Sequence, residues 1–235
     1  MLTAFAVAVV AAIVLIVALA PRAPDPRAAP VPQADTPPAS ATPGPGLSGA
    51  VDATWAAEVA AATGIPERAV LAYAGAARDA ALNREECGIG WNTIAAIGLV
   101  ESDHGRHDGS SIGPDGTVSP PIYGPPLTGE GTADIDDTDD GALDGDAEHD
   151  RAVGPMQIIP ASWASWGFDA NADGRTDPQN IDDAAIATAN YLCRSSGEDM
   201  VSIDGWRTGI GGYNVGGQYL RDVEAAARDY AEVAP

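Results

Sequence analysis

The chain has 235 residues, of which 34 are acidic and 12 are lysine or arginine, so its formal net charge is −22. A surface this acidic excludes nucleic acid and anionic lipid headgroups as partners, because both are negatively charged. About 185 residues remain after a non-globular first fifth, which is enough for one compact domain, expected to be a monomer.

The first residues are strongly apolar. Residues 2–20 contain no polar side chain other than Thr3, and a run of this length can cross a bilayer as one helix. Residues 1–20 are therefore predicted to be a signal peptide or a membrane anchor. The end Ala18-Leu19-Ala20 is typical of a cleavage site, but Pro21 follows it and favours an uncleaved anchor.

Residues 21–49 are dominated by proline, alanine, glycine and threonine and are predicted to form a disordered linker to a domain spanning residues 50–235. Apolar periodicity predicts helices over residues 55–62, 66–81, 91–102, 183–194 and 217–233, with a short helix starting near Pro155 or Ser162. Strand signals are nearly absent, and residues 103–152 are too long for a plain connection. The expected fold class is mainly α, with long acidic loops and little or no sheet.

The only two cysteines are Cys87 and Cys193. In an exported domain such a pair indicates one disulfide bond. Two buried free thiols are the alternative if the domain is cytoplasmic.

Glu101 stands at the end of an apolar helical stripe. Ile97 and Gly98 share its helix face and should partly deprive its carboxyl of water, which raises the pKa of such a group. A carboxyl that keeps its proton near neutral pH can act as a general acid, above all in sugar-bond cleavage. The alternative is an ordinary surface glutamate.

Three later segments place amide and phenol groups beside glycine, in residues 151–160, 189–192 and 212–216. Such groups suit a groove that hydrogen-bonds sugar hydroxyls and N-acetyl groups.

Four ordered motifs, Val100-Glu101-Ser102 with His104-Gly105, Arg151-Ala152 through Gly154-Pro155-Met156-Gln157, Ala189-Asn190-Tyr191, and Tyr213-Asn214, give the chain a family resemblance. Over residues 51–233 it resembles the lytic murein transglycosylases, particularly the membrane-bound lytic transglycosylase B type and its actinobacterial relatives. The resemblance implies a lysozyme-like helical fold with Glu101 as the single catalytic acid/base. The substrate-binding residues that it implies are Ser102, Arg151, Gln157, Tyr191, Tyr213 and Asn214.

The same resemblance implies a reaction and a location. The substrate would be the glycan strands of peptidoglycan, cut between MurNAc and GlcNAc without water to leave 1,6-anhydro-muramyl ends. The nearest acid in sequence, Asp103, is turned away from Glu101 by two helical steps and is a poor second carboxylate. The enzyme would be extracytoplasmic, either secreted or tethered to the membrane facing the wall. A hydrolytic muramidase and a non-catalytic, calcium-stabilised wall-binding protein are the alternatives.

Residues 169–177 contain the first half of a calcium-binding EF-hand loop, because oxygen ligands occupy loop positions one, three and five, followed by Gly174. The usual closing glutamate is replaced by Asn180, and the resemblance places the closing ligand at Asp183. One structural Ca²⁺ is predicted here, and an Asx-rich turn without metal is the alternative. The expected ligands are Asp169, Asn171, Asp173, the backbone carbonyl of Arg175, and Asp183.

A second acidic loop repeats this register with Asp136, Thr138, Asp140 and Asp144. We hypothesise a second calcium ion there, against the alternative of a solvated acidic loop. The closing ligand is open among Asp146, Glu148 and Asp150.

The sequence also departs from the family. Glu148 stands nine positions before Gln157, where some relatives carry a small hydroxyl residue. The polar partner of Glu101 is therefore unassigned.

Overall fold

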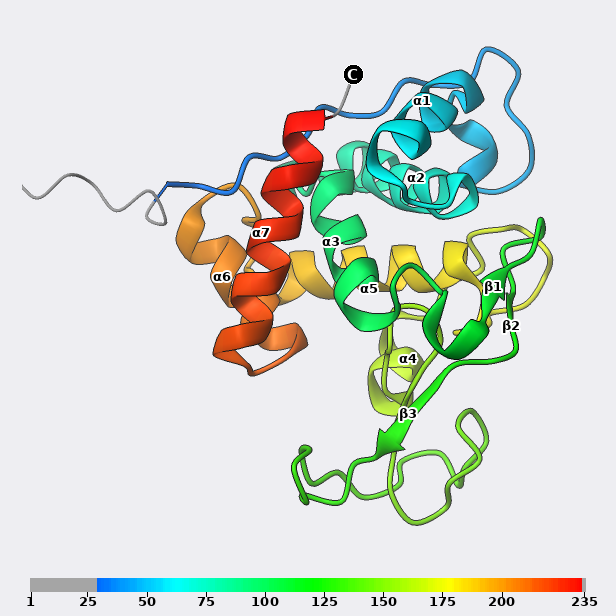
Figure 1. The fold of residues 1–235 in the computed structure, drawn as a ribbon, viewed down its shortest axis with the longest axis vertical. Coiled ribbons are helices and arrows are strands. Elements are labelled where there is room, and N and C mark those ends of the chain that lie inside the picture. Colours follow the sequence, from blue (N-terminus) through cyan, green and yellow to red (C-terminus); the bar gives the residue numbers. More distant parts are fainter. Residues whose placement is uncertain (1–28, 234–235) are drawn as a thin grey trace, which may run out of the picture.

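The computed structural model describes residues 29–233 as a mainly helical domain, which confirms the predicted fold class (Figure 1). The predicted helix over residues 91–102 agrees with α3 residue for residue. The seven helices of the described residues are α1 (Ala53–Thr63), α2 (Glu67–Asn83), α3 (Trp91–Ser102), α4 (Pro160–Trp166), α5 (Ile181–Ser195), α6 (Ile203–Tyr213) and α7 (Gly217–Val233).

Helix α6 was not predicted from the sequence. Its eleven residues include four glycines, which lower helix propensity. The helix forms because Trp206 and Ile210 are fully buried and because Gly209 lets it approach Met200 closely. Tertiary packing thus outweighs weak local preference.

Within the described residues, four short strands lie between α3 and α4. Strand β1 (Ser111–Ile112) pairs with β2 (Val118–Ser119), and β3 (Tyr123–Pro126) pairs with β4 (Arg151–Val153), both antiparallel. Because β3 and β4 are neighbours, the chain leaves and re-enters the domain at one place. Residues 127–150 therefore form a single long loop beside α4, at the bottom of Figure 1.

Helix α3 lies at the centre of the core. Residues 91 to 98 are all buried, and α3 packs most extensively on α7 and also on α2, while α5 packs on α2 and α6. Figure 1 shows α7 alongside α3 and α5 running beneath α2. The helix that carries Glu101 is consequently held from several sides.

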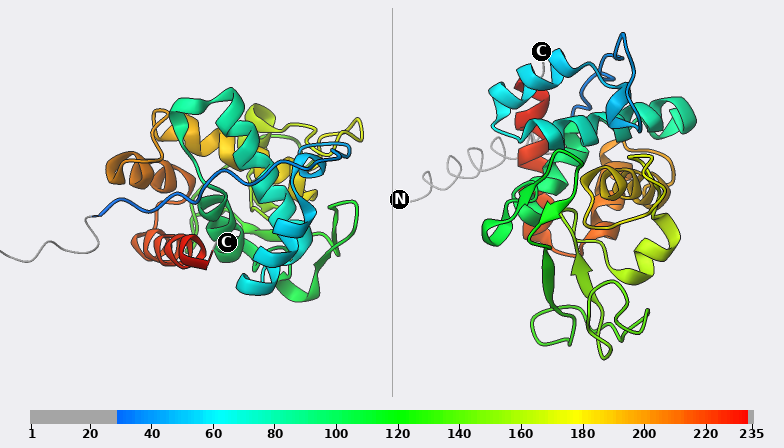
Figure 2. Two further views of the ribbon diagram at one scale, coloured as in Figure 1. Left: turned by 90° about the horizontal axis from the view of Figure 1, so that it is seen from above. Right: turned by 90° about the vertical axis from the view of Figure 1, so that its right-hand side faces the viewer.

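The segment before α1 differs from the predicted disordered linker. From residue 29 onward it runs along the domain surface (Figure 2), and Val31 belongs to the core with 2% exposure. Asn92 Nδ2 donates to the Pro32 carbonyl at 2.8 Å, and Arg228 Nη2 donates to the Ala29 carbonyl at 2.8 Å. A proline-rich segment has no apolar periodicity that would predict such packing. It is held by helix side chains that hydrogen-bond to its backbone carbonyl groups.

The predicted signal or anchor over residues 1–20 and the start of the predicted linker lie outside the described residues. Within residues 29–233, no helix combines the length and the apolar character needed to span a membrane.

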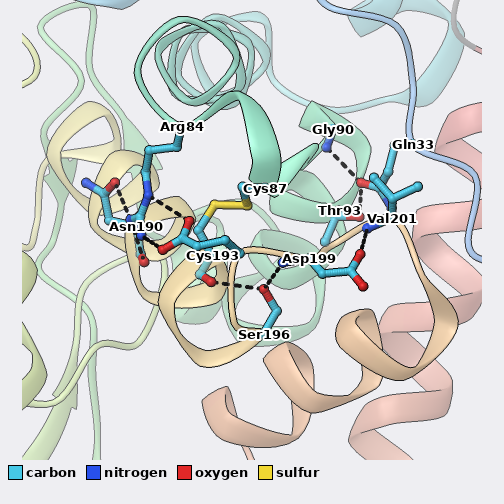
Figure 3. Close-up of a disulfide and its surroundings, with 11 residues drawn as sticks. Gln33, Arg84, Cys87, Gly90, Thr93, Asn190, Cys193, Ser196, Asp199 and Val201 are labelled. Atoms are coloured by element: carbon cyan, nitrogen blue, oxygen red, sulfur yellow. Dashed lines mark hydrogen bonds and ion pairs between the residues drawn. A yellow bond between two sulfur atoms is a disulfide. The ribbon is translucent and has the colours of Figure 1, made fainter.

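The predicted disulfide between Cys87 and Cys193 is present and joins the turn after α2 to α5, across a sequence separation of 106 (Figure 3). Arg84 lies beside it and donates from Nε to Glu198 Oε2 at 3.1 Å and from Nη1 to the Asn190 carbonyl at 3.1 Å. The covalent bond and these contacts fix the two elements together.

Candidate active site

Glu101 lies in the last turn of α3 and lines a cleft of about 690 Å³. The helix ends directly behind it, because Asp103 and His104 both adopt the left-handed conformation. Their backbone N–H groups bond back to Leu99 and Gly98 at 2.9 and 2.8 Å, which satisfies carbonyls at the helix end. This closure fixes the backbone that carries the carboxyl.

The Glu101 carboxyl is short of water. Burial raises its pKa to about 7, and a hydrogen bond from the Tyr219 hydroxyl to Oε1 at 2.6 Å opposes that rise. A partly desolvated carboxyl is what the apolar stripe of α3 predicted.

Tyr219 is the polar partner that sequence reasoning missed. It lies on α7, where it shares one face with the buried residues Val223, Ala226 and Tyr230. This stripe indicates that the face is buried, but nothing in the sequence indicates that it packs against Glu101.

Four of the predicted substrate-binding residues line the same cleft. Gln157 comes from the segment after β4, Tyr191 from α5, and Tyr213 and Asn214 from the end of α6. Elements far apart in sequence thus converge around Glu101. Trp166 and Thr188 also line the cleft and were not predicted.

The two cleft tyrosines donate their hydroxyls to the main chain. Tyr213 Oη donates to the Met156 carbonyl at 2.7 Å, and Tyr191 Oη donates to the Gly212 carbonyl at 2.5 Å. Their rings meet edge to face with centroids 5.5 Å apart. They therefore brace the cleft wall, and what they offer a ligand is chiefly ring surface.

Ser102 and Arg151 have other positions than predicted, since neither lines the cleft. Ser102 is 3% exposed and its hydroxyl donates to the Pro155 carbonyl at 2.6 Å. Arg151 Nε donates to the Gly124 carbonyl at 2.9 Å, across the β3–β4 ladder. Ser102 lies on the side of α3 that packs on the Gln157 segment. Ser102 and Arg151 therefore connect the elements that carry the cleft residues and do not line the cleft themselves.

Glu101 is the only acidic residue among the described residues that line the cleft. Asp103 is exposed and forms an ion pair with Arg106 at 2.6 Å. No second carboxylate of the cleft lining can therefore serve as nucleophile or base.

The acidic loop supplies an uncharged wall to the cleft, which was not predicted. Leu127 and Ile135 line it, together with the small residues Gly131, Thr132 and Ala133. Backbone bonds hold this wall, from Ile135 N to the Leu127 carbonyl at 2.9 Å and from Leu127 N to the Asp150 carbonyl at 3.1 Å.

Residues 146–203 match the model of the Transglycosylase SLT domain. Over this segment the chain is similar to the Transglycosylase SLT domain, and its mainly helical fold is consistent with the match. Comparisons with curated proteins and with solved structures found no match.

The segment that matches the SLT domain contains Gln157 and Tyr191 but not Glu101 or Tyr219. The structure brings Glu101 and the matched segment together in one cleft, and residues of the acidic loop and of the end of α6 complete its lining.

The SLT segment also contains the first predicted calcium loop. The Asp169 carboxylate accepts backbone N–H groups of Asp173 and Gly174 at 3.1 and 2.9 Å. Asp183 accepts those of Ala170 and Asp177 at 2.7 and 2.9 Å, and burial raises its pKa to about 6. The predicted side-chain ligands all offer oxygen, as calcium requires, although the three carboxylates do not gather within 4.8 Å of one another.

The second acidic loop does not bring the predicted ligands together. Asp136 and Asp140 are exposed, and the Thr138 hydroxyl donates to Asp150 Oδ2 at 2.8 Å. Asp144 is buried and accepts the Arg151 N–H at 2.6 Å.

The carboxylates that do lie within 4.8 Å of one another belong to Asp137, Asp139 and Asp150. Asp137 and Asp139 each follow a predicted ligand by one residue, and Asp136 itself forms a β-bridge with His149. Successive side chains of an extended chain point to opposite sides, so Asp137 turns inward where Asp136 turns outward.

Proposed function

We propose that this chain is a peptidoglycan lytic transglycosylase that cleaves the bond between MurNAc and GlcNAc, with Glu101 as its single acid and base. One observation carries the proposal: among the described residues, a desolvated glutamic acid is the only acidic group that lines a cleft of aromatic, amide and small apolar residues. The SLT match of one cleft wall supports the same chemistry.

Proton donation is the first step. A pKa of about 7 leaves a large fraction of Glu101 protonated at neutral pH, as a general acid requires. The acid transfers its proton to the glycosidic oxygen as the bond to C1 breaks. The Tyr219 hydroxyl, which donates to Oε1, stabilises the carboxylate left behind.

The second step must proceed without a second carboxylate. Glycosidases with two carboxylates use one of them as nucleophile or base, and the described residues place one carboxylate in this cleft. The substrate's own N-acetyl group would stabilise the cation at C1. The Glu101 carboxylate then accepts the proton of the muramyl C6 hydroxyl, whose oxygen attacks C1. Glu101 is again protonated, and no water is consumed.

A digestion experiment tests the catalytic role of Glu101. Purified peptidoglycan is incubated with the wild-type chain, with Glu101→Gln, and with Glu58→Gln, which changes an exposed glutamate of α1. Soluble fragments should appear at equal rates with the wild type and Glu58→Gln. They should fall by at least about 10²-fold with Glu101→Gln. A Glu101→Gln variant as active as wild type would refute the proposal, and wall binding without release of fragments would indicate a binding protein.

We also propose that the loop spanning Asp169 to Asp183 binds one structural Ca²⁺. The predicted ligands in this loop are hard oxygen donors, and the loop is folded around two of their carboxylates. The ion would fix the distance between the Gln157 segment and α5. Chelation should lower the melting temperature of the wild type, and calcium should restore it. Asp183→Asn should lose this response, and a melting temperature insensitive to chelator would contradict the site.

The proposed location is extracytoplasmic, with residues 1–20 as a signal or a membrane tether. The disulfide supports an oxidising compartment. Fractionation of expressing cells tests this, because a reduced, cytoplasmic chain would contradict it.

A further inference from the structure

His104 is a buried polar residue that the proposed chemistry does not use. It is 1% exposed and lies two residues after the end of α3. Its Nδ1 lies 3.1 Å from the Tyr73 hydroxyl of α2, and its Nε2 lies 3.0 Å from the Tyr230 hydroxyl of α7. One imidazole therefore connects three helices at the centre of the domain.

The Tyr73–His104–Tyr230 chain is neutral at physiological pH. Burial lowers the pKa of His104 to about 4, with a smaller contribution from Arg106 against an opposing one from Asp103. Burial also raises the pKa of Tyr230 to about 12 and that of Tyr73 further. A neutral imidazole has one N–H donor and one bare nitrogen, so one tyrosine accepts and the other donates. Both bonds are satisfied only in this arrangement.

Gly98 leaves the space that the hydrogen-bonded Tyr73–His104–Tyr230 chain needs beside α3. A Cβ atom at this position would lie 2.1 Å from the Tyr73 hydroxyl oxygen, so only glycine lets Tyr73 pass against α3 to reach His104. The helix carrying Glu101 thus has a gap where the tyrosine crosses it, one turn before the carboxyl.

Helix α7 connects the Tyr73–His104–Tyr230 chain to the Glu101 carboxyl. Tyr219 and Tyr230 are eleven residues apart, which is close to three helical turns, so both lie on one face of α7. Tyr219 donates to Glu101, and Tyr230 bonds to His104. Asn92 Nδ2 adds a bond from α3 to the Ala227 carbonyl at 2.9 Å. A slide or rotation of α7 along α3 would break the contacts at both ends together.

We propose that His104 is a positioning residue: through Tyr230 it sets the register of α7 against α3 and so holds the Tyr219 hydroxyl on Glu101. The placement follows from the contacts, and its importance for catalysis rests on the proposed function. Glu101 and Tyr219 touch the reaction, whereas His104 acts only through α7.

The test measures the Glu101 pKa directly, from the chemical shift of its carboxyl carbon as a function of pH. Tyr219→Phe removes the bond that lowers this pKa and should raise it by about one pH unit. Tyr230→Phe keeps a ring stacked on Trp91 and should raise the Glu101 pKa in the same direction. His104→Asn should also raise the Glu101 pKa. Asparagine suits this position because it tolerates the left-handed conformation that His104 adopts. In the double variant of Tyr219 and Tyr230, the shift should not exceed that of Tyr219→Phe alone.

Thr93→Val is the matched control. Thr93 lies on the same helix, is fully buried, and accepts a hydrogen bond from Trp206 Nε1 at 3.2 Å. Its replacement should lower the melting temperature and leave the Glu101 pKa unchanged. In every active variant, the alkaline limb of the pH profile of the digestion rate should move with the Glu101 pKa. A purely structural loss would lower the rate without moving that limb.

The proposal is overturned if Tyr219→Phe raises the Glu101 pKa while Tyr230→Phe and His104→Asn, folded by circular dichroism, leave it at the wild-type value. An equal shift in Thr93→Val would overturn it too. The carboxyl titration needs no activity, so failure of the wild type to cleave peptidoglycan would refute the proposed function and leave this test intact.

Discussion

Replacing Glu101 by glutamine should stabilise the protein, and the gain should depend on pH. Glutamine has nearly the same shape, and its carbonyl can still accept the Tyr219 hydroxyl bond. The change removes only an ionisable group whose charged form is disfavoured by burial.

The magnitude follows from the raised pKa. In the unfolded chain the Glu101 pKa has its ordinary value of 4.5, and in the folded protein it is about 7. At pH values below the lower pKa, Glu101 is protonated in both the folded and the unfolded protein, so no charge is buried and the free energy of unfolding is not reduced. Between the two values the unfolded state ionises first, so the free energy of unfolding falls as pH rises. Above the higher value the full cost, about 3 kcal/mol, is present.

Chemical denaturation at about pH 4 and about pH 8 measures this effect. Glu101→Gln should match the wild type at the lower pH. It should exceed it by about 2 to 3 kcal/mol at the higher pH, or roughly 5 to 10 °C in melting temperature. Glu58→Gln, at an exposed position, should show no such dependence. A Glu101→Gln gain that is absent, or equal at both pH values, would refute the claim that Glu101 is desolvated.

Three further changes test the scaffold. Cys87→Ser opens a loop of 106 residues and should cost about 4 to 5 kcal/mol, after which a reductant no longer lowers the stability measured in denaturant. Gly98→Ala should lower the melting temperature, at a cost of about 1 to 3 kcal/mol, and Tyr73→Phe in that background should restore part of it. Arg68→Met leaves the Asp182 carboxylate, 1% exposed, without its ion-pair partner and should cost about 3 kcal/mol; no loss would show that the pair is not formed in solution.

The sequence predicted the helices whose apolar periodicity is strong. Helix α3 was located correctly because nearly its whole length is buried, and Glu101 was singled out by the stripe leading to it. Helix α6 was missed because its glycines oppose the local signal. The packed segment from residue 29 was missed because its partners are helix side chains such as Asn92 and Arg228.

The candidate site was predicted in part, for a different reason. Gln157, Tyr191, Tyr213 and Asn214 were found through motif order, and all four line the cleft. Tyr219 could not be found this way, because its role depends on how α7 packs on α3.

Ser102 and the second acidic loop show what the spacing of residues in a sequence does not predict. Ser102 follows Glu101 in sequence but faces the Pro155 carbonyl in the core. The ligand spacing around Asp136 predicts a loop register that differs from the one in the structure, where Asp136 forms a bridge with His149. Spacing in a sequence predicts which residues are close, but the local backbone decides which way each side chain points.

The central claim, that one carboxylate cleaves the glycan without water, is tested most directly by digesting purified peptidoglycan in water enriched in heavy oxygen and weighing the products. The account predicts muramyl ends that are lighter than reducing ends by one water and carry no heavy oxygen. Reducing ends that carry the label would contradict it, because they would show that water attacks C1.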